Sequence, residues 1–279
     1  MIRLYIPFYS DKELLKLTIA SAQRQTAADV DVTILDDCSA EISGRDDLDL
    51  DADANVKYRR NPVNLGMVGN WNQALEGDAG LAAIVHADDL LAPDYCQVML
   101  DAAQAHGDAA LYFCKANVID QQGRPVFSLP DFVKRLLFRH RGPATLVGEH
   151  GAAALLRGNF IFCPTVAYNL KNLGDIRFDP RWRMVQDLDL LLRVLESGRS
   201  IVGVPTAAYH YRRHQQNATV QYTRNLLRFR EENQLYLEAA ARYRERGWLR
   251  AARVARRRTI VKLNLAYCTL RDALALRMG

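Results

Sequence analysis

Hydrophobic and polar positions alternate with two different periods in the first half of the chain. Short apolar runs with strand-like spacing are separated by stretches in which apolar residues recur every three or four positions. Strands that alternate with helices in this rhythm are typical of βαβ units, and they predict a mostly parallel sheet with ligands at the carboxyl ends of its strands. The predicted strands are 3–6, 30–35, 55–59, 81–85 and 109–118, and the predicted helices are 12–25, 67–76 and 93–105.

The second half of the chain is less regular. Residues 119–148 contain several glycines and prolines and a basic stretch, and we interpret them as an irregular connection or lid. Beyond them the pattern predicts helices at 151–156 and 187–195 and short strands at 201–204 and 208–212. From residue 220 to the end the spacing is helical, with a break near Gly247.

Composition narrows the class of protein. The 279 residues are 49% hydrophobic and 25% charged, which excludes a disordered or collagen-like chain. No apolar run approaches the ~18 residues that are needed to cross a bilayer. The five cysteines are odd in number and form no C-x-x-C pair, so neither a zinc site nor a disulfide framework is indicated. Because the thiols are expected to be reduced and the amino terminus lacks a signal-peptide pattern, we expect a cytoplasmic protein.

Charge is spread unevenly along the chain. Residues 224–279 hold 14 Lys and Arg against 5 Asp and Glu, whereas the rest of the chain holds 23 against 27. Such a basic tail indicates one local contact with an anionic partner, and no nucleic-acid-binding motif accompanies its arginines. Residues 248–261 combine five arginines with apolar side chains, as in an amphipathic helix that lies on an anionic membrane surface. The alternative is a helix packed on the rest of the protein with a solvated basic face.

Three acidic clusters fall where apolar segments stop. The pair at 36–37 ends a predicted strand, where a carboxylate can accept a hydrogen bond from a nucleobase or a ribose. The cluster His86-Ala87-Asp88-Asp89 offers ligands that suit Mg²⁺ or Mn²⁺. Asp187 opens a predicted helix and suits a general base. Helix capping or a local turn is the alternative interpretation of each cluster taken alone.

Two further segments carry polar groups toward the same strand ends. Residues 61–72 form a glycine- and amide-rich loop that opens a helix, a pattern that favours contact with phosphate or ribose. Residues 209–217 form a basic, aromatic loop in which Arg or His side chains suit a diphosphate leaving group. A solvated surface turn is the alternative for this loop.

Together and in this order, these segments resemble the family 2 glycosyltransferases of the GT-A fold, over roughly residues 2–219. These are inverting enzymes that use nucleotide-diphosphate sugars. The motifs that carry the resemblance are Ile6-Pro7-Phe8-Tyr9-Ser10, Ile34-Leu35-Asp36-Asp37-Cys38-Ser39, Asn64-Leu65-Gly66 with Asn70, His86-Ala87-Asp88-Asp89, Gly158-Asn159-Phe160, Asp187-Leu188-Asp189 and Tyr211-Arg212-Arg213-His214.

The resemblance implies an α/β architecture. Its GT-A fold has a Rossmann-like, mostly parallel central sheet flanked by helices, and here a C-terminal helical extension would follow. Residues 1–219 would form the catalytic domain, with a donor half at about 1–118 and an acceptor half at about 149–219. Residues 220–279 would form the basic helical extension.

The resemblance also implies the residues that hold the donor. Asp37 would bind the nucleobase, with Pro7 and Tyr9 as the wall of its pocket. His214 and Arg212 would contact the departing diphosphate. The other implied contacts to the nucleotide sugar are Asn64, Gly66, Asn70 and Asp88.

The implied cofactor is a divalent ion, Mn²⁺ or Mg²⁺, that bridges the two phosphates. Asp89 would be its more direct ligand, and Asp88 would contact both the ribose and the metal. Asp187 would take the proton from the acceptor hydroxyl. Two positions depart from the family pattern: His86 replaces the first Asp of the D-x-D motif, and Gln186 replaces the acidic residue that commonly precedes the base.

The implied function is transfer of a sugar to a hydroxyl of a glycan or lipid-linked acceptor, in the biosynthesis of cell-surface polysaccharide or lipopolysaccharide. The implied location is the cytoplasm or the inner face of the cytoplasmic membrane, with peripheral contact through the basic C-terminal helices. The departures at His86 and Gln186 leave a second hypothesis open, a catalytically silent nucleotide-sugar-binding subunit of a membrane-associated glycan assembly. A nicotinamide-dependent dehydrogenase or a sugar-nucleotide pyrophosphorylase would need a glycine-rich loop after the first strand, where this chain has Pro7-Phe8-Tyr9-Ser10.

Overall fold

The first half of the chain forms regular βαβ units. The computed structural model describes all residues except 49, 51–54, 78–79, 139–140, 215–221, 224 and 279, and for 271–278 only the backbone. The first elements are β1 (Ile2–Phe8), α1 (Lys12–Gln23), β2 (Val30–Asp36), β3 (Val56–Arg60), α2 (Gly66–Ala74), β4 (Leu81–Ile84), β5 (Leu90–Leu91), α3 (Tyr95–Ala105) and β6 (Leu111–Ile119). Each strand and helix predicted from the apolar spacing in this half is confirmed, with ends that differ by a few residues.

The second half of the chain adds helices and the remaining strands. Its elements are α4 (Leu129–Leu137), β7 (Ala144–Leu146), α5 (Gly148–Arg157), β8 (Val166–Asn169), α6 (Leu170–Leu173), α7 (Gln186–Glu196), β9 (Ile201–Arg212), α9 (Leu227–Glu245), α10 (Leu249–Arg257) and α11 (Thr259–Met278). The segment 119–148, predicted to be irregular, contains both α4 and β7. The two strands predicted at 201–204 and 208–212 form one strand, because shifts in the register of β6 against β9 accommodate the intervening residues.

One central sheet joins the two halves. Its strand order is β3-β2-β1-β4-β8-β6-β9-β5, with β7 beside β9. Strands β1 to β4 pair in parallel, as in a Rossmann-like sheet, and β6 and β9 also run parallel. Between these two groups, β8 runs antiparallel to both of its neighbours. The carboxyl ends of β1, β2 and β4 therefore meet at one edge, where the acidic clusters follow them.

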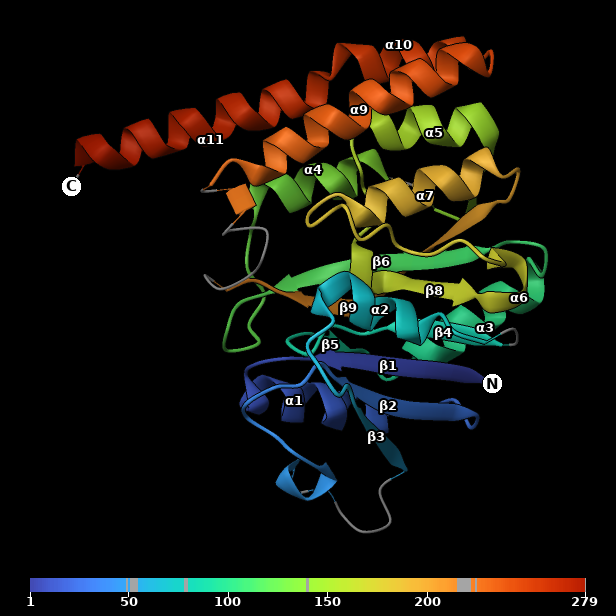
Figure 1. The fold of residues 1–279 in the computed structure, drawn as a ribbon, viewed down its shortest axis with the longest axis vertical. Coiled ribbons are helices and arrows are strands. Elements are labelled where there is room, and N and C mark those ends of the chain that lie inside the picture. Colours follow the sequence, from blue (N-terminus) through green and yellow to red (C-terminus); the bar gives the residue numbers. More distant parts are fainter. Residues whose placement is uncertain are drawn as a thin grey trace.

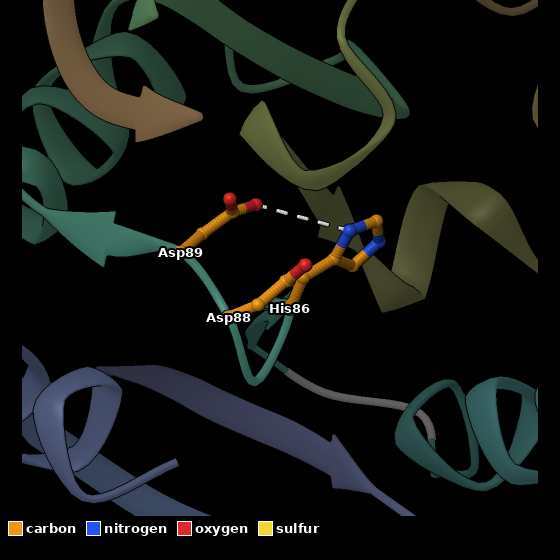
Figure 2. A group of neighbouring side chains, drawn as sticks. All are labelled: His86, Asp88 and Asp89. Atoms are coloured by element: carbon orange, nitrogen blue, oxygen red, sulfur yellow. Dashed lines mark ion pairs between the residues drawn. The ribbon is translucent and has the colours of Figure 1, made fainter. Parts of the chain in front are cut away.

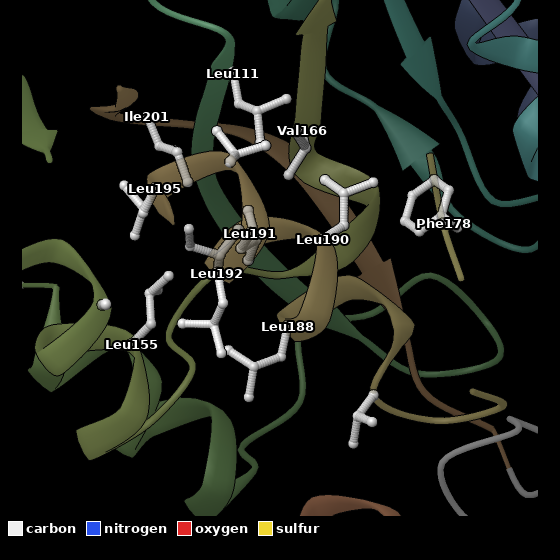
Figure 3. Packing of buried hydrophobic residues seen from close by; sticks show 14 of the residues in the cluster. Leu111, Leu155, Val166, Phe178, Leu188, Leu190, Leu191, Leu192, Leu195 and Ile201 are labelled. Carbon is white, nitrogen blue, oxygen red and sulfur yellow. The ribbon is translucent and has the colours of Figure 1, made fainter. Parts of the chain in front are cut away.

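Each face of the sheet carries its own hydrophobic core. In β6, Leu111 and Phe113 pack into one core, whereas Tyr112 and Cys114 pack into the other, as the alternation of side chains along a strand requires. Figure 3 shows leucines of α7 packed against residues of β6, β8 and β9 in the first core. This packing fixes the position of α7, and with it the position of Asp187 at its start.

The C-terminal helices cover the end of the molecule opposite β1, β2 and β3 (Figure 1). The predicted break near Gly247 is confirmed, because that glycine adopts a φ of 83° between α9 and α10. Ala251 and Ala255 are fully buried, and Trp248 and Val254 pack against the first core. The apolar side of α10 thus faces the protein, which matches the packed alternative and leaves its basic side exposed. Among the described residues, no helix is long and apolar enough to span a membrane.

Leu195 tests how strongly the position of α7 depends on the core. Its side chain is fully buried and lies against Gly151 of α5. We expect Leu195→Ala to lower the free energy of unfolding by about 2–5 kcal/mol, since it removes buried methyl groups and leaves a cavity. Leu17→Ala, at an exposed position of α1, should change it by less than about 0.5 kcal/mol. Urea denaturation measures both, and equal effects would contradict this account of the core.

Candidate active site

The end of β2 lies beside the end of β1 and holds the first acidic cluster. Asp36 is fully buried, where it accepts hydrogen bonds from Tyr58 Oη (2.5 Å) and the Ser39 backbone (2.9 Å) and forms an ion pair with Arg60. Asp37 comes next, and its backbone N–H donates to the Phe8 carbonyl at 2.8 Å. Asp36 therefore anchors the turn, and Asp37 is the carboxylate next to the end of β1.

The predicted base-binding residues lie together at this edge. Pro7 is half-buried in β1, and Tyr9 follows the strand with 58% of its side chain exposed. Asp37 is only 3% exposed, and its Oδ1 accepts from Asn61 Nδ2 (2.9 Å) and from the Leu65 backbone (2.8 Å). Among the described residues, no hydrogen bond engages its Oδ2. That oxygen is the one available to a ligand.

Asn70, which the family resemblance assigns to the nucleotide sugar, is buried beside this edge of the sheet. It is 2% exposed, its Nδ2 donates to the Leu35 carbonyl at 2.8 Å, and its Oδ1 accepts from Asn61 Nδ2 at 3.1 Å. Both ends of its amide are therefore used inside the protein. Asn70 positions Asn61, and through it Asp37.

Asn64 and Gly66 lie in the exposed loop that opens α2. Asn64 Oδ1 accepts from the Gly66 backbone at 2.8 Å, and Gly66 has a φ of 72°, a conformation that favours glycine. Both residues are exposed, so contact with a ligand is open to each of them.

The second acidic cluster groups three side chains that fit a divalent cation. His86, Asp88 and Asp89 each bring one ligand atom within 4.8 Å of the others (Figure 2). Burial lowers the pKa of His86, which keeps its imidazole neutral near pH 7, and its buried Nε2 has no hydrogen-bond partner among the described residues. Two carboxylates and a neutral imidazole form a donor set that suits Mn²⁺ or Mg²⁺.

The two aspartates of this cluster differ in accessibility. Asp89 is fully buried, and its oxygens accept from the Arg212 backbone (2.6 Å) and from Tyr209 Oη (3.0 Å). Asp88 keeps 26% of its side chain exposed and lies 2.8 Å from His214 Nε2. Asp88 is thus the more exposed of the two aspartates, whereas the oxygens of Asp89 bond to β9.

Their pKa values follow the same difference. Burial and the neighbouring charge of Asp88 raise the pKa of Asp89 well above its ordinary value. Burial also opposes ionisation of Asp88, but the hydrogen bond with His214 and the proximity of His86 outweigh it, and the pKa of Asp88 is lowered.

Arg212, which the family resemblance assigns to the diphosphate, is buried and hydrogen-bonded within the protein. It is 1% exposed, and its guanidinium donates to the carbonyls of Asp88 (2.6 Å), Asp120 (3.1 Å) and Gln121 (2.8 Å). His214, two residues later, remains beside Asp88. The rest of the predicted basic loop, from Gln215 to Asn217, lies outside the described residues.

The third cluster opens α7. Asp187 Oδ2 accepts from Asn159 Nδ2 at 3.2 Å, and Asp187 lines a narrow pocket with Ile161, Cys163 and Phe178. Burial raises the pKa of Asp187, while the ammonium of Lys134 on α4 and the hydrogen bond from Asn159 lower it. Gln186, in place of a second acid, is buried, and its Oε1 has no hydrogen-bond partner among the described residues.

Cys163 lines the same pocket as Asp187. Burial raises the pKa of the Cys163 thiol well above its ordinary value, and the carboxylates of Asp187 and Asp89 raise it further.

Helix α2 connects all three clusters. Asn70 belongs to the hydrogen-bond network of Asp37, and Trp71 stacks on His86 with ring centroids 5.2 Å apart. Trp71 also meets Phe178 edge-on at 5.3 Å. Asn72 donates to the Phe178 carbonyl and accepts from its N–H, both at 2.9 Å. Since Phe178 lines the pocket of Asp187, one helix joins the parts of a single site.

Comparison with known proteins agrees with this arrangement. The family described as glycosyl transferase family 2 matches residues 4–161, which is more than half of the chain. The chain belongs to glycosyl transferase family 2. That family is named for glycosyl transfer.

Relatives and solved structures extend the family assignment. Over 219 residues the chain is 26% identical to the succinoglycan biosynthesis protein ExoO of Rhizobium meliloti, which covers 73% of this chain and 58% of that protein. A crystal structure of S. aureus TarS 1-349 in complex with UDP-GlcNAc aligns with a TM-score of 0.61 at 17% identity, over 85% of this chain and 66% of that one. The mannosyltransferase PcManGT of Pyrobaculum calidifontis, in complex with GDP-Man and Mn²⁺, aligns with a TM-score of 0.57 at 14% identity, over 100% of this chain and 80% of that one. The chain thus spans less than two thirds of ExoO and of the TarS structure, and both structures share its GT-A fold.

Several residues that shape this family 2 site were not singled out as site residues from the sequence. Asn61 and Trp71 lie within the loop 61–72, but the spacing of residues in that loop does not reveal which amides and rings face the site. Asn159 lies in the motif Gly158-Asn159-Phe160, but only the structure shows its hydrogen bond to Asp187. Lys134 lies 53 residues before Asp187, and in the sequence only its place in a basic stretch indicates a role for it.

The accessibility of Asp88 leads to a test with the metal alone. We expect Asp88→Asn to weaken Mn²⁺ binding by about tenfold or more, because a neutral amide replaces the exposed carboxylate. Asp101→Asn, at an exposed position of α3, should leave Mn²⁺ binding unchanged. Titration calorimetry with MnCl₂ measures both. Wild-type affinity in Asp88→Asn would remove Asp88 from the ligand set.

Proposed function

We propose that the chain is an inverting glycosyltransferase that moves a sugar from a nucleotide-diphosphate donor to a hydroxyl of an acceptor. The observation that carries the proposal is the role of α2. Its Trp71 stacks on His86 of the carboxylate cluster and meets Phe178, which lines the pocket of Asp187. Family membership supports the same activity.

The donor would lie along the carboxyl ends of β1, β2 and β4. Asp37 Oδ2 would accept from the nucleobase, with Pro7 and the exposed ring of Tyr9 beside it. Asn64 and Gly66 lie in an exposed loop whose backbone N–H groups suit phosphate or ribose oxygens. His214 is the basic group next to Asp88. TarS and PcManGT, which share this fold, were each solved with a nucleotide sugar, and this supports such a donor here.

A divalent ion would be held mainly by Asp88, with His86 and Asp89 beside it. When bound, Mn²⁺ or Mg²⁺ supplies Lewis-acid stabilisation of the charge on the diphosphate. Asp89 would contribute chiefly by holding β9, and thereby His214, close to Asp88.

Asp187 would act as the general base. The acceptor oxygen forms a bond to the anomeric carbon as the bond from that carbon to the diphosphate breaks, and its proton passes to the Asp187 carboxylate. The diphosphate leaves with the electron pair of the broken bond, and a single displacement inverts the anomeric centre. Burial raises the pKa of Asp187 and so strengthens it as a base, while Lys134 and Asn159 favour the ionised form that must accept the proton.

The acceptor would be a growing glycan of the cell surface. The relative named for succinoglycan biosynthesis supports an extracellular or surface polysaccharide as the product class.

The cytoplasmic location expected from the cysteines remains a prediction, as do the two domain boundaries near residues 118 and 219.

Asp187→Asn tests the base. We expect transfer to fall by about 10²–10⁴-fold, because the amide cannot take the proton, while donor binding stays nearly unchanged. The control is Asp175→Asn, at an exposed position between α6 and α7, which should keep full transfer. The measurement is release of nucleoside diphosphate with Mn²⁺ present, over a panel of UDP-, GDP- and dTDP-sugars.

Two results of that assay would contradict the proposal. Wild-type transfer by Asp187→Asn would exclude Asp187 as the base. Tight nucleotide binding without turnover of any donor by the unmodified chain would favour the silent subunit instead.

Lys134→Met tests the electrostatic control of Asp187. The ammonium of Lys134 lowers the pKa of Asp187, so its loss should raise that pKa. Because the base works only when ionised, the acid limb of the pH–rate profile should move to higher pH, by about one unit. Lys171→Met, which removes an exposed charge on α6, should leave the limb in place. An unshifted limb in Lys134→Met would mean that this lysine does not act on the base.

A further inference from the structure

Helix α4 turns Asp131 and Lys134 toward the protein and most of its apolar side chains to the outside. Asp131 is 2% exposed and pairs with Arg213 Nη2 at 2.7 Å. Lys134 lies over the ring of Phe162, with its Nζ 4.4 Å from the ring centroid, and Phe138 is buried. Positions 131, 134 and 138 are spaced as one face of a helix, so this face is turned inward.

The opposite face of α4 is apolar and uncovered in the described chain. Phe132 is 51% exposed and Leu136 48%, and the preceding Phe127 is 75% exposed. The other exposed apolar residues of this segment are Val126, Leu129, Val133 and Leu137. A surface helix of a soluble protein normally has the reverse arrangement, and an exposed apolar patch of this kind marks an interaction site.

The start of α11 extends the same kind of surface. Leu263 and Leu270 are 60% and 63% exposed, and Leu265 and Tyr267 are also exposed. A Cβ atom on Gly158 would lie 2.7 Å from Leu137 of α4 and 3.8 Å from Ile260 of α11, so the end of α4 and the start of α11 meet at this glycine. Figure 1 shows both helices at the end of the molecule opposite β1 to β3.

Basic residues outnumber acidic ones in the sequence segments that carry these apolar residues. Residues 121–148 contain five Lys and Arg and a single acid, Asp131, which is buried and paired. Residues 249–270 contain six Lys and Arg and no acid. A surface that combines exposed apolar side chains with an excess of basic ones matches a partner that is apolar inside and negatively charged outside.

We propose that α4 and the first half of α11 form a docking surface for an anionic phospholipid bilayer. The apolar side chains would enter the boundary between headgroups and acyl chains, and the surrounding arginines and lysines would contact the phosphates. A second copy of the chain fits this surface poorly, because pairing would bring two basic patches together. A lipid surface satisfies both the apolar and the basic groups.

Docking in this way would bring the pocket of Asp187 close to the bilayer. Lys134 lies on the inner side of the docking helix and acts on Asp187, so the helix separates that pocket from the proposed lipid contact. This consequence rests on the proposed function and favours an acceptor carried by a lipid. The docking itself does not rest on it.

Vesicle flotation tests the proposal with the full chain. We expect the protein to float with vesicles of 70% phosphatidylcholine and 30% phosphatidylglycerol, to remain unbound with phosphatidylcholine alone, and to be released by high salt. The double variant Phe132→Ser with Leu136→Ser should bind the anionic vesicles at least about tenfold more weakly. Leu17→Ser, on exposed α1 at the other end of the molecule, should bind like the wild type.

Three outcomes would overturn the docking surface. The first is equal vesicle binding by the double variant and the wild type, with circular dichroism showing both folded. The second is equal binding to neutral and anionic vesicles. The third is a dimer in analytical ultracentrifugation that the double variant abolishes, which would assign the surface to a second copy. Release of nucleoside diphosphate in solution is measured in parallel, so that failed docking with intact turnover leaves the proposed function standing.

Discussion

Three consecutive residues of α2 hold the site together. Successive side chains of an α-helix point about 100° apart, so neighbours reach different surroundings. Asn70 supports the Asp37 network, Trp71 covers His86, and Asn72 binds the backbone of Phe178 at both its N–H and its carbonyl. The ends of β1, β2 and β4 alone would leave the pocket of Asp187 unconnected to Asp37 and His86. The relative position of the carboxylates therefore depends on this single helical turn.

Buried polar groups divide into those that hold the site and those that face it. Asp36, Asp89 and Arg212 are almost inaccessible, and each is surrounded by hydrogen bonds, as a buried charge requires. Asp88 and His214 keep some exposure beside them. Two adjacent aspartates of one motif thus have different surroundings: Asp89 bonds to β9, and Asp88 is partly exposed beside His214.

The sequence was most informative where periodicity was strong. The runs that became β1, β2 and β4 and the helix at Asp187 were predictable, because each places apolar residues at a regular period. Strand β8 has only four residues and gave no such signal, and α4 is flanked by glycines and prolines that favoured a loop. The resemblance of motifs identified Asn70 and Arg212 but not the orientation of their side chains. The same residue type can contact a ligand or support the site from inside the protein. The influence of Lys134 on Asp187 depends on tertiary packing between distant segments.

The ion pair of Asp131 with Arg213 has a mechanical consequence. Arg213 immediately precedes His214, whose ring lies beside Asp88, so α4 and the loop of Asp88 are joined through two adjacent residues of one backbone. A displacement of α4 must either break this ion pair or shift His214 relative to Asp88. Whatever stabilises this position of α4 would therefore favour the placement of His214 beside Asp88, and the donor proposed to bind there would in turn favour this position of α4.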